Sequence, residues 1–168
     1  MKKVKSLLLA TGVSVILSMG IASCNTDKCK DVVCQNSGVC LEGTCDCPTG
    51  YEGEFCETKA NAKFSGTWTV NETCNSVIGT AYPVIISAAT DPTSVTMKDL
   101  GNYSCTSGSY NVPATVTGSS ISVSGTVCST VFTGTGTLNA AGNSIALTYS
   151  ATYGTPSTTD NCTATLTK

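Results

Sequence analysis

The side chains alternate between two characters along Ser144-Ile-Ala-Leu-Thr-Tyr-Ser-Ala-Thr-Tyr153, and this alternation indicates the fold class. Ile145, Leu147 and Tyr149 recur at every second position, and the residues between them are hydroxylated or small. Since successive side chains of a strand point to opposite faces, this period of two predicts a strand with one buried face. The same alternation recurs through almost all of residues 64–168.

The alternation divides this region into eight expected strands. Turn formers such as Asp91-Pro92 and Gly101-Asn102 interrupt the pattern between them. Eight short-looped strands favour an all-β, antiparallel up-and-down β-barrel, because closure removes the exposed edges of a sheet. A two-sheet β-sandwich is the alternative. The expected strands are 64–72, 81–89, 94–100, 109–117, 120–127, 130–138, 144–153 and 162–168.

The chain begins with an export signal. Lysines open it, an uncharged apolar stretch runs from Leu7 to Ile21, and small residues precede Cys24. This stretch is shorter than the roughly 20 residues of a membrane-spanning helix. Residues 1–23 are therefore expected to form a cleaved signal peptide.

Residues 21–24, Ile-Ala-Ser-Cys, resemble the lipobox of bacterial lipoproteins. The resemblance implies a diacylglycerol on the Cys24 thiol and a further acyl chain, such as palmitate, on its new amine. Residues 24–28 would then be a lipidated tether. Asn25 stands where Asp favours the inner membrane, so the resemblance implies the outer membrane of a Gram-negative bacterium. The alternative, a structural Cys24, would leave one of the other cysteines unpaired.

Ten cysteines follow Cys24, and an even number in an exported chain indicates five disulfides. A cysteine-only metal site needs paired C-x-x-C spacings, whereas the tightest pair here is Cys45-Asp46-Cys47. We therefore expect no bound metal and no cofactor.

Six of these cysteines, between residues 29 and 56, have the spacing C-x4-C-x5-C-x4-C-x-C-x8-C, which alone leaves several connectivities open. Cys45-Asp-Cys-Pro-Thr-Gly-Tyr51, followed by Gly53 and Cys56, closely resembles the C-terminal signature of an EGF-like module. The resemblance implies a rigid spacer at 29–56, with residues 57–63 as a polar linker to the domain at 64–168. It also implies the pairs Cys29–Cys40, Cys34–Cys45 and Cys47–Cys56.

The last four cysteines fall in or beside the first, third, fifth and seventh strand connections. Connections of a meander alternate between its two ends, so all four are expected at one end, which we call the stapled end. An antiparallel closing register that places Cys74 opposite Cys162 also places Trp68 opposite Lys168. We expect the pairs Cys74–Cys162 and Cys105–Cys128, with Cys74–Cys105 and Cys128–Cys162 as the alternative.

Phe64-Ser-Gly-Thr-Trp68 opens the first strand and is similar to the G-x-W motif of lipocalin-type barrels. The resemblance implies that Trp68, beside Gly66, plugs the floor of a small lipocalin-like β-barrel. The combination of lipobox, EGF-like module and small barrel also resembles surface lipoproteins of Gram-negative bacteria whose function is undetermined.

The scarcity of charge limits the chemistry of the chain. It has no histidine, which excludes Ser-His and Cys-His nucleophiles and His-ligated zinc. Removal of the leader leaves an excess of about five carboxylates, so nucleic acid is not an expected partner. The carboxylates of residues 64–168 are expected in turns or on the polar face, with Asp99 at a strand end. We therefore expect no enzyme. These carboxylates are Glu72, Asp91, Asp99 and Asp160.

Three noncatalytic functions fit this sequence. The preferred one is a membrane-anchored interaction module whose loops at the stapled end contact a protein, glycan or matrix. The second is a lipocalin-like carrier of a small apolar ligand, should small inward residues leave a cavity instead of permitting curvature and tight packing. The third is a binder of a glycan or crystalline surface through threonine rows such as 133–137. No partner or oligomeric state is assigned. The small inward residues are Ala114, Gly125, Gly134, Gly136 and Ala164.

Overall fold

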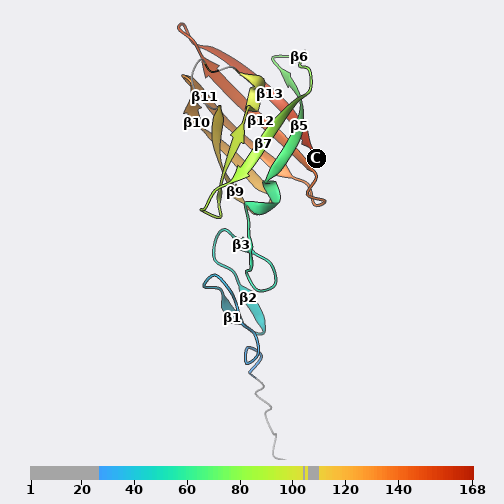
Figure 1. The fold of residues 1–168 in the computed structure, drawn as a ribbon, viewed down its shortest axis with the longest axis vertical. Helices are drawn as coiled ribbons and strands as arrows, with labels where there is room; N and C mark the ends of the chain where they lie inside the picture. The colour runs from blue at the N-terminus through green and yellow to red at the C-terminus, as the bar shows by residue number, and fades with distance from the viewer. Residues whose placement is uncertain (1–26, 104, 106–109) are drawn as a thin grey trace, which may run out of the picture.

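The computed structural model describes residues 27–103, 105 and 110–168. The expected signal peptide, residues 1–23, and the expected acylation site, Cys24, lie outside the described residues. An N-terminal disulfide module and a β-barrel follow one another along the long axis (Figure 1). In the part of the chain that is described, no helix has the length and apolar character needed to cross a membrane.

Two short hairpins and three disulfides form the N-terminal module. The hairpins pair β1 (Val39–Leu41) with β2 (Thr44–Asp46) and β3 (Tyr51–Glu52) with β4 (Thr58–Lys59). Few of its side chains are buried, so the bridges substitute for an apolar core. The bridges are Cys29–Cys40, Cys34–Cys45 and Cys47–Cys56, the pairs that the EGF-like resemblance implies.

Eight antiparallel strands close into a barrel, which confirms the expected fold class over the sandwich alternative. Consecutive strands pair as a meander, and the last strand pairs with the first. The strands are β5 (Gly66–Cys74), β7 (Tyr82–Ala88), β8 (Ser94–Lys98), β9 (Asn111–Thr117), β10 (Ser120–Val127), β11 (Thr130–Leu138), β12 (Ser144–Tyr153) and β13 (Thr158–Thr167).

Alternate side chains fill the barrel interior, where Trp68, Phe132 and Met97 are among the largest fully buried residues. The inward glycines lie in close contact with neighbouring strands. A Cβ on Gly134 would lie 2.5 Å from the carbonyl oxygen of Thr148, and Ala114 and Ala164 are both buried in the core. The small inward residues therefore serve close strand packing.

Short elements at both ends of the barrel depart from the expected strands. A 3-10 turn, η1 (Ala62–Phe64), replaces the expected start of the first strand. β6 (Val77–Ile78) folds back on β5 as an extra short strand, and η2 (Leu100–Asn102) follows β8.

β13 starts at Thr158, four residues before its expected start. Asp160 and Asn161 are poor strand formers, so the sequence predicted a later start. Their pairing with Ala151 and Ser150 of β12 overrides that preference.

The expected polar linker, 57–63, is an ordered junction between module and barrel. Asn61 is completely buried, although it is polar. Its side-chain amide donates to the carbonyl oxygens of Ala89 at 3.2 Å and Asp91 at 2.8 Å in the β7–β8 loop, and to that of Ser94 at 2.9 Å at the start of β8. Because buried polar groups need partners, these bonds hold the loop and the junction together.

Two further contacts fix the module on the barrel. A Cβ on Gly50 would lie 2.8 Å from Cγ of Pro92, so module and barrel meet too closely there for a larger residue. On the module side of the junction, Lys63 forms an ion pair with Glu52 at 2.7 Å. These contacts favour one rigid rod over two domains on a flexible tether.

Candidate functional site

The stapled end of the barrel lies opposite the N-terminal module (Figure 1). Cys74 and Cys162 are direct ladder partners across the β5–β13 seam and form one bridge. Cys105, in the β8–β9 connection, forms the other with Cys128 in the β10–β11 turn. These pairs are the ones expected from the closing register, and they hold the loops of this end together.

Trp68 lies at the other end, at the barrel floor. Its side chain is fully buried, and its indole N–H donates to the carbonyl oxygen of Phe64 at 2.8 Å. The ammonium of Lys168 lies 4.4 Å from the centre of the ring system, a cation–π distance. Gly66 has a φ of 133°, and a Cβ there would meet the Lys168 side chain. The Gly66–Trp68 motif thus closes the floor.

Glu72 enters the barrel interior at the stapled end, so its expected place in a turn or on the polar face is wrong. The sequence predicted that the first strand ends at residue 72. β5 instead continues to Cys74, and Glu72 keeps the inward parity of Trp68 and Val70. Tyr149 donates its hydroxyl to Glu72 at 2.6 Å. A Glu72 oxygen also lies within 4.8 Å of the Cys74 and Cys162 sulfurs, but bridged sulfurs are not thiolate ligands.

Buried tyrosines surround this carboxylate. Burial raises the pKa of Tyr149 and of Tyr82 well above the usual range, and the negative charge of Glu72 raises both further. Tyr82 accepts a hydrogen bond from the backbone N–H of Gly101 at 2.8 Å, which ties η2 to the barrel wall. Because these hydroxyls stay protonated, they act as hydrogen-bond donors to the carboxylate.

Asp160, a second inward carboxylate, organises the rim of the same end. It accepts hydrogen bonds from the hydroxyls of Tyr103 at 2.8 Å and Tyr153 at 3.0 Å, and from the side-chain amide of Asn75 at 2.8 Å. The two tyrosine rings lie 5.6 Å apart. Neutral donors therefore satisfy the carboxylate, and the network holds these four side chains together at the rim.

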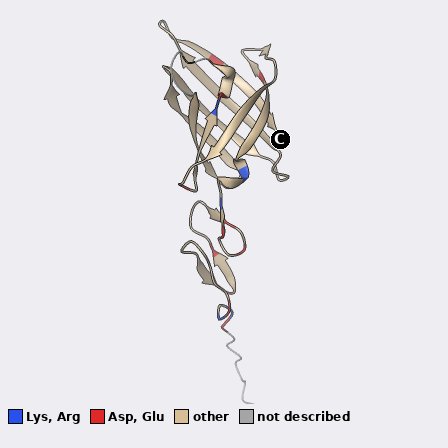
Figure 2. Cartoon of the chain, in the orientation of Figure 1, with Lys and Arg blue, Asp and Glu red and all other residues tan. Residues whose placement is uncertain are grey.

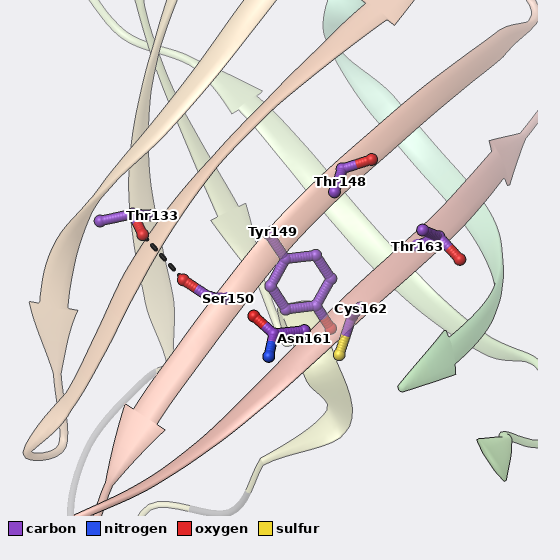
Figure 3. A pocket seen from close by; sticks show the side chains of 7 residues that line it. All are labelled: Thr133, Thr148, Tyr149, Ser150, Asn161, Cys162 and Thr163. Atoms are coloured by element: carbon purple, nitrogen blue, oxygen red, sulfur yellow. Dashed lines mark hydrogen bonds between the residues drawn. The ribbon is translucent and has the colours of Figure 1, made fainter. Parts of the chain in front are cut away.

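A hollow of about 300 Å³ lies on the outer wall over β11, β12 and β13 (Figure 3). Within it, the hydroxyl oxygens of Thr133 and Ser150 are 2.8 Å apart. The barrel wall around it is poor in charge (Figure 2). Such a lining can exchange hydrogen bonds with a neutral polar ligand. The lining residues are Thr133, Thr148, Tyr149, Ser150, Asn161, Cys162 and Thr163.

A hairpin tip projects apolar side chains at the stapled end. Val77 and Ile78 of β6 are 69% and 82% exposed. The turn before them, Asn75-Ser76, has positive φ at both residues, as a tight two-residue hairpin requires. Sequence reasoning missed this element, and the available signal was a turn-forming Asn-Ser pair between Thr73-Cys74 and the β-branched Val77-Ile78.

No family model matches the chain, and no curated protein does. A solved structure of a Bacteroides ovatus protein of unknown function is 15% identical, with a TM-score of 0.40 over 60% of this chain and 39% of that one. A redesigned β-barrel is 18% identical, with a TM-score of 0.39 over 65% of this chain and 94% of that one. The chain thus spans well under half of the Bacteroides protein, and its function is inferred from its own residues.

Proposed function

We propose that this protein is a lipid-anchored, noncatalytic interaction module of the bacterial cell envelope, which holds the stapled end of its barrel toward a partner. The lipobox-like residues 21–24 support acylation at Cys24, and Asn25 supports the outer membrane. The disulfides support an oxidising compartment. The three bridges of the N-terminal module support its role as an EGF-like spacer.

The placement of the stapled end carries this proposal. The described chain begins at Asp27, three residues after the proposed anchor, on the far side of the module from the barrel (Figure 1). The junction around Asn61 joins module and barrel firmly. An anchor at Cys24 would therefore keep the stapled end away from the membrane, where loops on a rigid scaffold commonly bind partners.

The stapled end offers the chemistry of a contact surface. The β6 tip supplies exposed apolar area, and the nearby rim supplies tyrosine rings and neutral hydrogen-bonding groups. Carriage of an apolar ligand is less favoured, because the inward glycines lie tightly against neighbouring strands. Binding through threonine rows stays a weaker alternative, supported by the neutral hollow on the wall.

Anchoring is tested with Cys24→Ala in the native cell. The variant should lose palmitate label and leave the membrane fraction, and unchanged fractionation would contradict acylation as the tether. The contact is tested with a photo-crosslinking amino acid at Ile78, and at the wall position Ile85, which is 41% exposed, as control. Crosslinks should form from Ile78 and not from Ile85. Equal yields at the two positions would contradict the stapled end as the contact surface.

A further inference from the structure

A second group of exposed apolar side chains lies on the N-terminal module. Val39 and Leu41 of β1 are 59% and 56% exposed. They are two residues apart in a strand, so they share one face of the β1–β2 hairpin. The other face carries Cys40 and Cys45, which are ladder partners and whose bridges run to Cys29 and Cys34. The face of Val39 and Leu41, which their ladder partners Asp46 and Thr44 share, is therefore turned away from these bridges.

The β1–β2 turn lies beside the start of the described chain. Lys28 forms an ion pair with Glu42 at 2.7 Å, and the N–H of Gly43 donates to the sulfur of Cys29 at 3.4 Å. A Cβ on Gly43 would lie 3.4 Å from Cβ of Lys28, so the turn packs directly against that residue. Leu41, next to this turn, is thereby held near Lys28.

The tether between Lys28 and Cys24 is short. Four residues span at most about 14 Å when fully extended. Each headgroup region of a bilayer is roughly 5–8 Å thick, by difference between total and hydrocarbon thickness. An acylated Cys24 therefore keeps the turn within reach of the interface. The Lys28–Glu42 pair also neutralises the two charges beside Leu41.

We propose that Val39 and Leu41 insert into the surface of the bilayer in which Cys24 is anchored. This inference rests on the proposed acylation of Cys24. The occupant of the surface formed by Val39 and Leu41 is lipid, because the tether length brings the bilayer to these two side chains and burial removes them from water. With acyl chains and hairpin both in contact with lipid, the rod is held at a defined tilt and does not swing about its tether.

Quenching by brominated lipid tests this contact. The acylated protein is reconstituted in phosphatidylcholine vesicles with brominated acyl chains, as the Leu41→Trp variant and separately as Val39→Trp. The natural Trp68 is fully buried in the barrel and gives a background that wild-type protein measures. Val131→Trp is the matched control, since Val131 is 44% exposed on the barrel wall.

The added fluorescence of Leu41→Trp and Val39→Trp should fall at least twofold in brominated vesicles, while that of Val131→Trp stays unchanged. Intact masses check that each variant keeps its five disulfides. If the proteins float with the vesicles and neither hairpin tryptophan is quenched, the insertion is refuted and the anchor stands. If acylation and flotation are both absent in wild-type protein, the proposed anchor itself is refuted.

Discussion

Removal of the seam disulfide should destabilise the barrel more than removal of the loop disulfide. Cys74–Cys162 joins residues 88 apart in the sequence, and Cys105–Cys128 joins residues 23 apart. In the chain-entropy model, these loop lengths correspond to about 4.6 and about 3.4 kcal/mol at 25 °C. The order follows from topology, because the first bridge links the two terminal strands of the barrel.

The double variants Cys74→Ala/Cys162→Ala and Cys105→Ala/Cys128→Ala remove each bridge without leaving a lone thiol. Urea unfolding is followed by the fluorescence of Trp68, the one tryptophan of the chain, which is buried at the floor far from both bridges. The seam variant should lose about 1 kcal/mol more unfolding free energy than the loop variant. Equal losses of unfolding free energy, or a larger loss in the loop variant, would refute the claim that the bridge between the terminal strands contributes more to barrel stability.

Three other predictions follow from packing and titration. Asn61→Ala removes three junction hydrogen bonds and should lower the unfolding free energy by about 1–3 kcal/mol. Proteases should then cleave within residues 57–63, and an unchanged cleavage pattern would contradict an ordered junction. Gly134→Ala should lower the unfolding free energy by about 1–3 kcal/mol, measured by urea unfolding, because its Cβ would meet the neighbouring strand. An unchanged free energy would indicate unfilled space at this position. Burial raises the pKa of Tyr110 to about 12, so the folded state retains a proton that the unfolded state loses near pH 10. Stability should therefore fall as the pH rises from about 10 toward 12. The part of the tyrosinate absorbance that Tyr110→Phe removes should appear together with unfolding, and its appearance near pH 10 in the folded protein would contradict the burial.

The barrel was predictable because its strands obey a simple period. Alternation in stretches such as 144–153 reports burial on one face, and the structure reproduces the bounds of β10, β11 and β12 as expected. The register between β5 and β13 was also predictable, since only one antiparallel register of these two strands brings Cys74 opposite Cys162.

The structure at the two ends of the barrel was harder to predict from the sequence, because tertiary contacts override the secondary-structure preferences of the residues there. The sequence placed Glu72 in a turn or on the polar face, yet inside the barrel its carboxylate accepts a hydrogen bond from the hydroxyl of Tyr149. The sequence placed Asp160 in a turn or on the polar face, yet it lies in β13, where its carboxylate accepts hydrogen bonds from the hydroxyls of Tyr103 and Tyr153. The sequence placed Asn61 in a polar linker. Its burial could not be predicted, because its hydrogen-bond acceptors, the carbonyl oxygens of Asp91 and Ser94, lie about 30 residues away in the sequence and reach its amide only in the folded chain.

The intact mass of the protein purified from its own membranes is the critical test of acylation at Cys24. We predict a chain that begins at Cys24, carries acyl chains on that residue and is ten hydrogens lighter than its reduced form. A mass that retains residues 1–23, or a peptide map in which Cys24 is bridged to another cysteine, would contradict it.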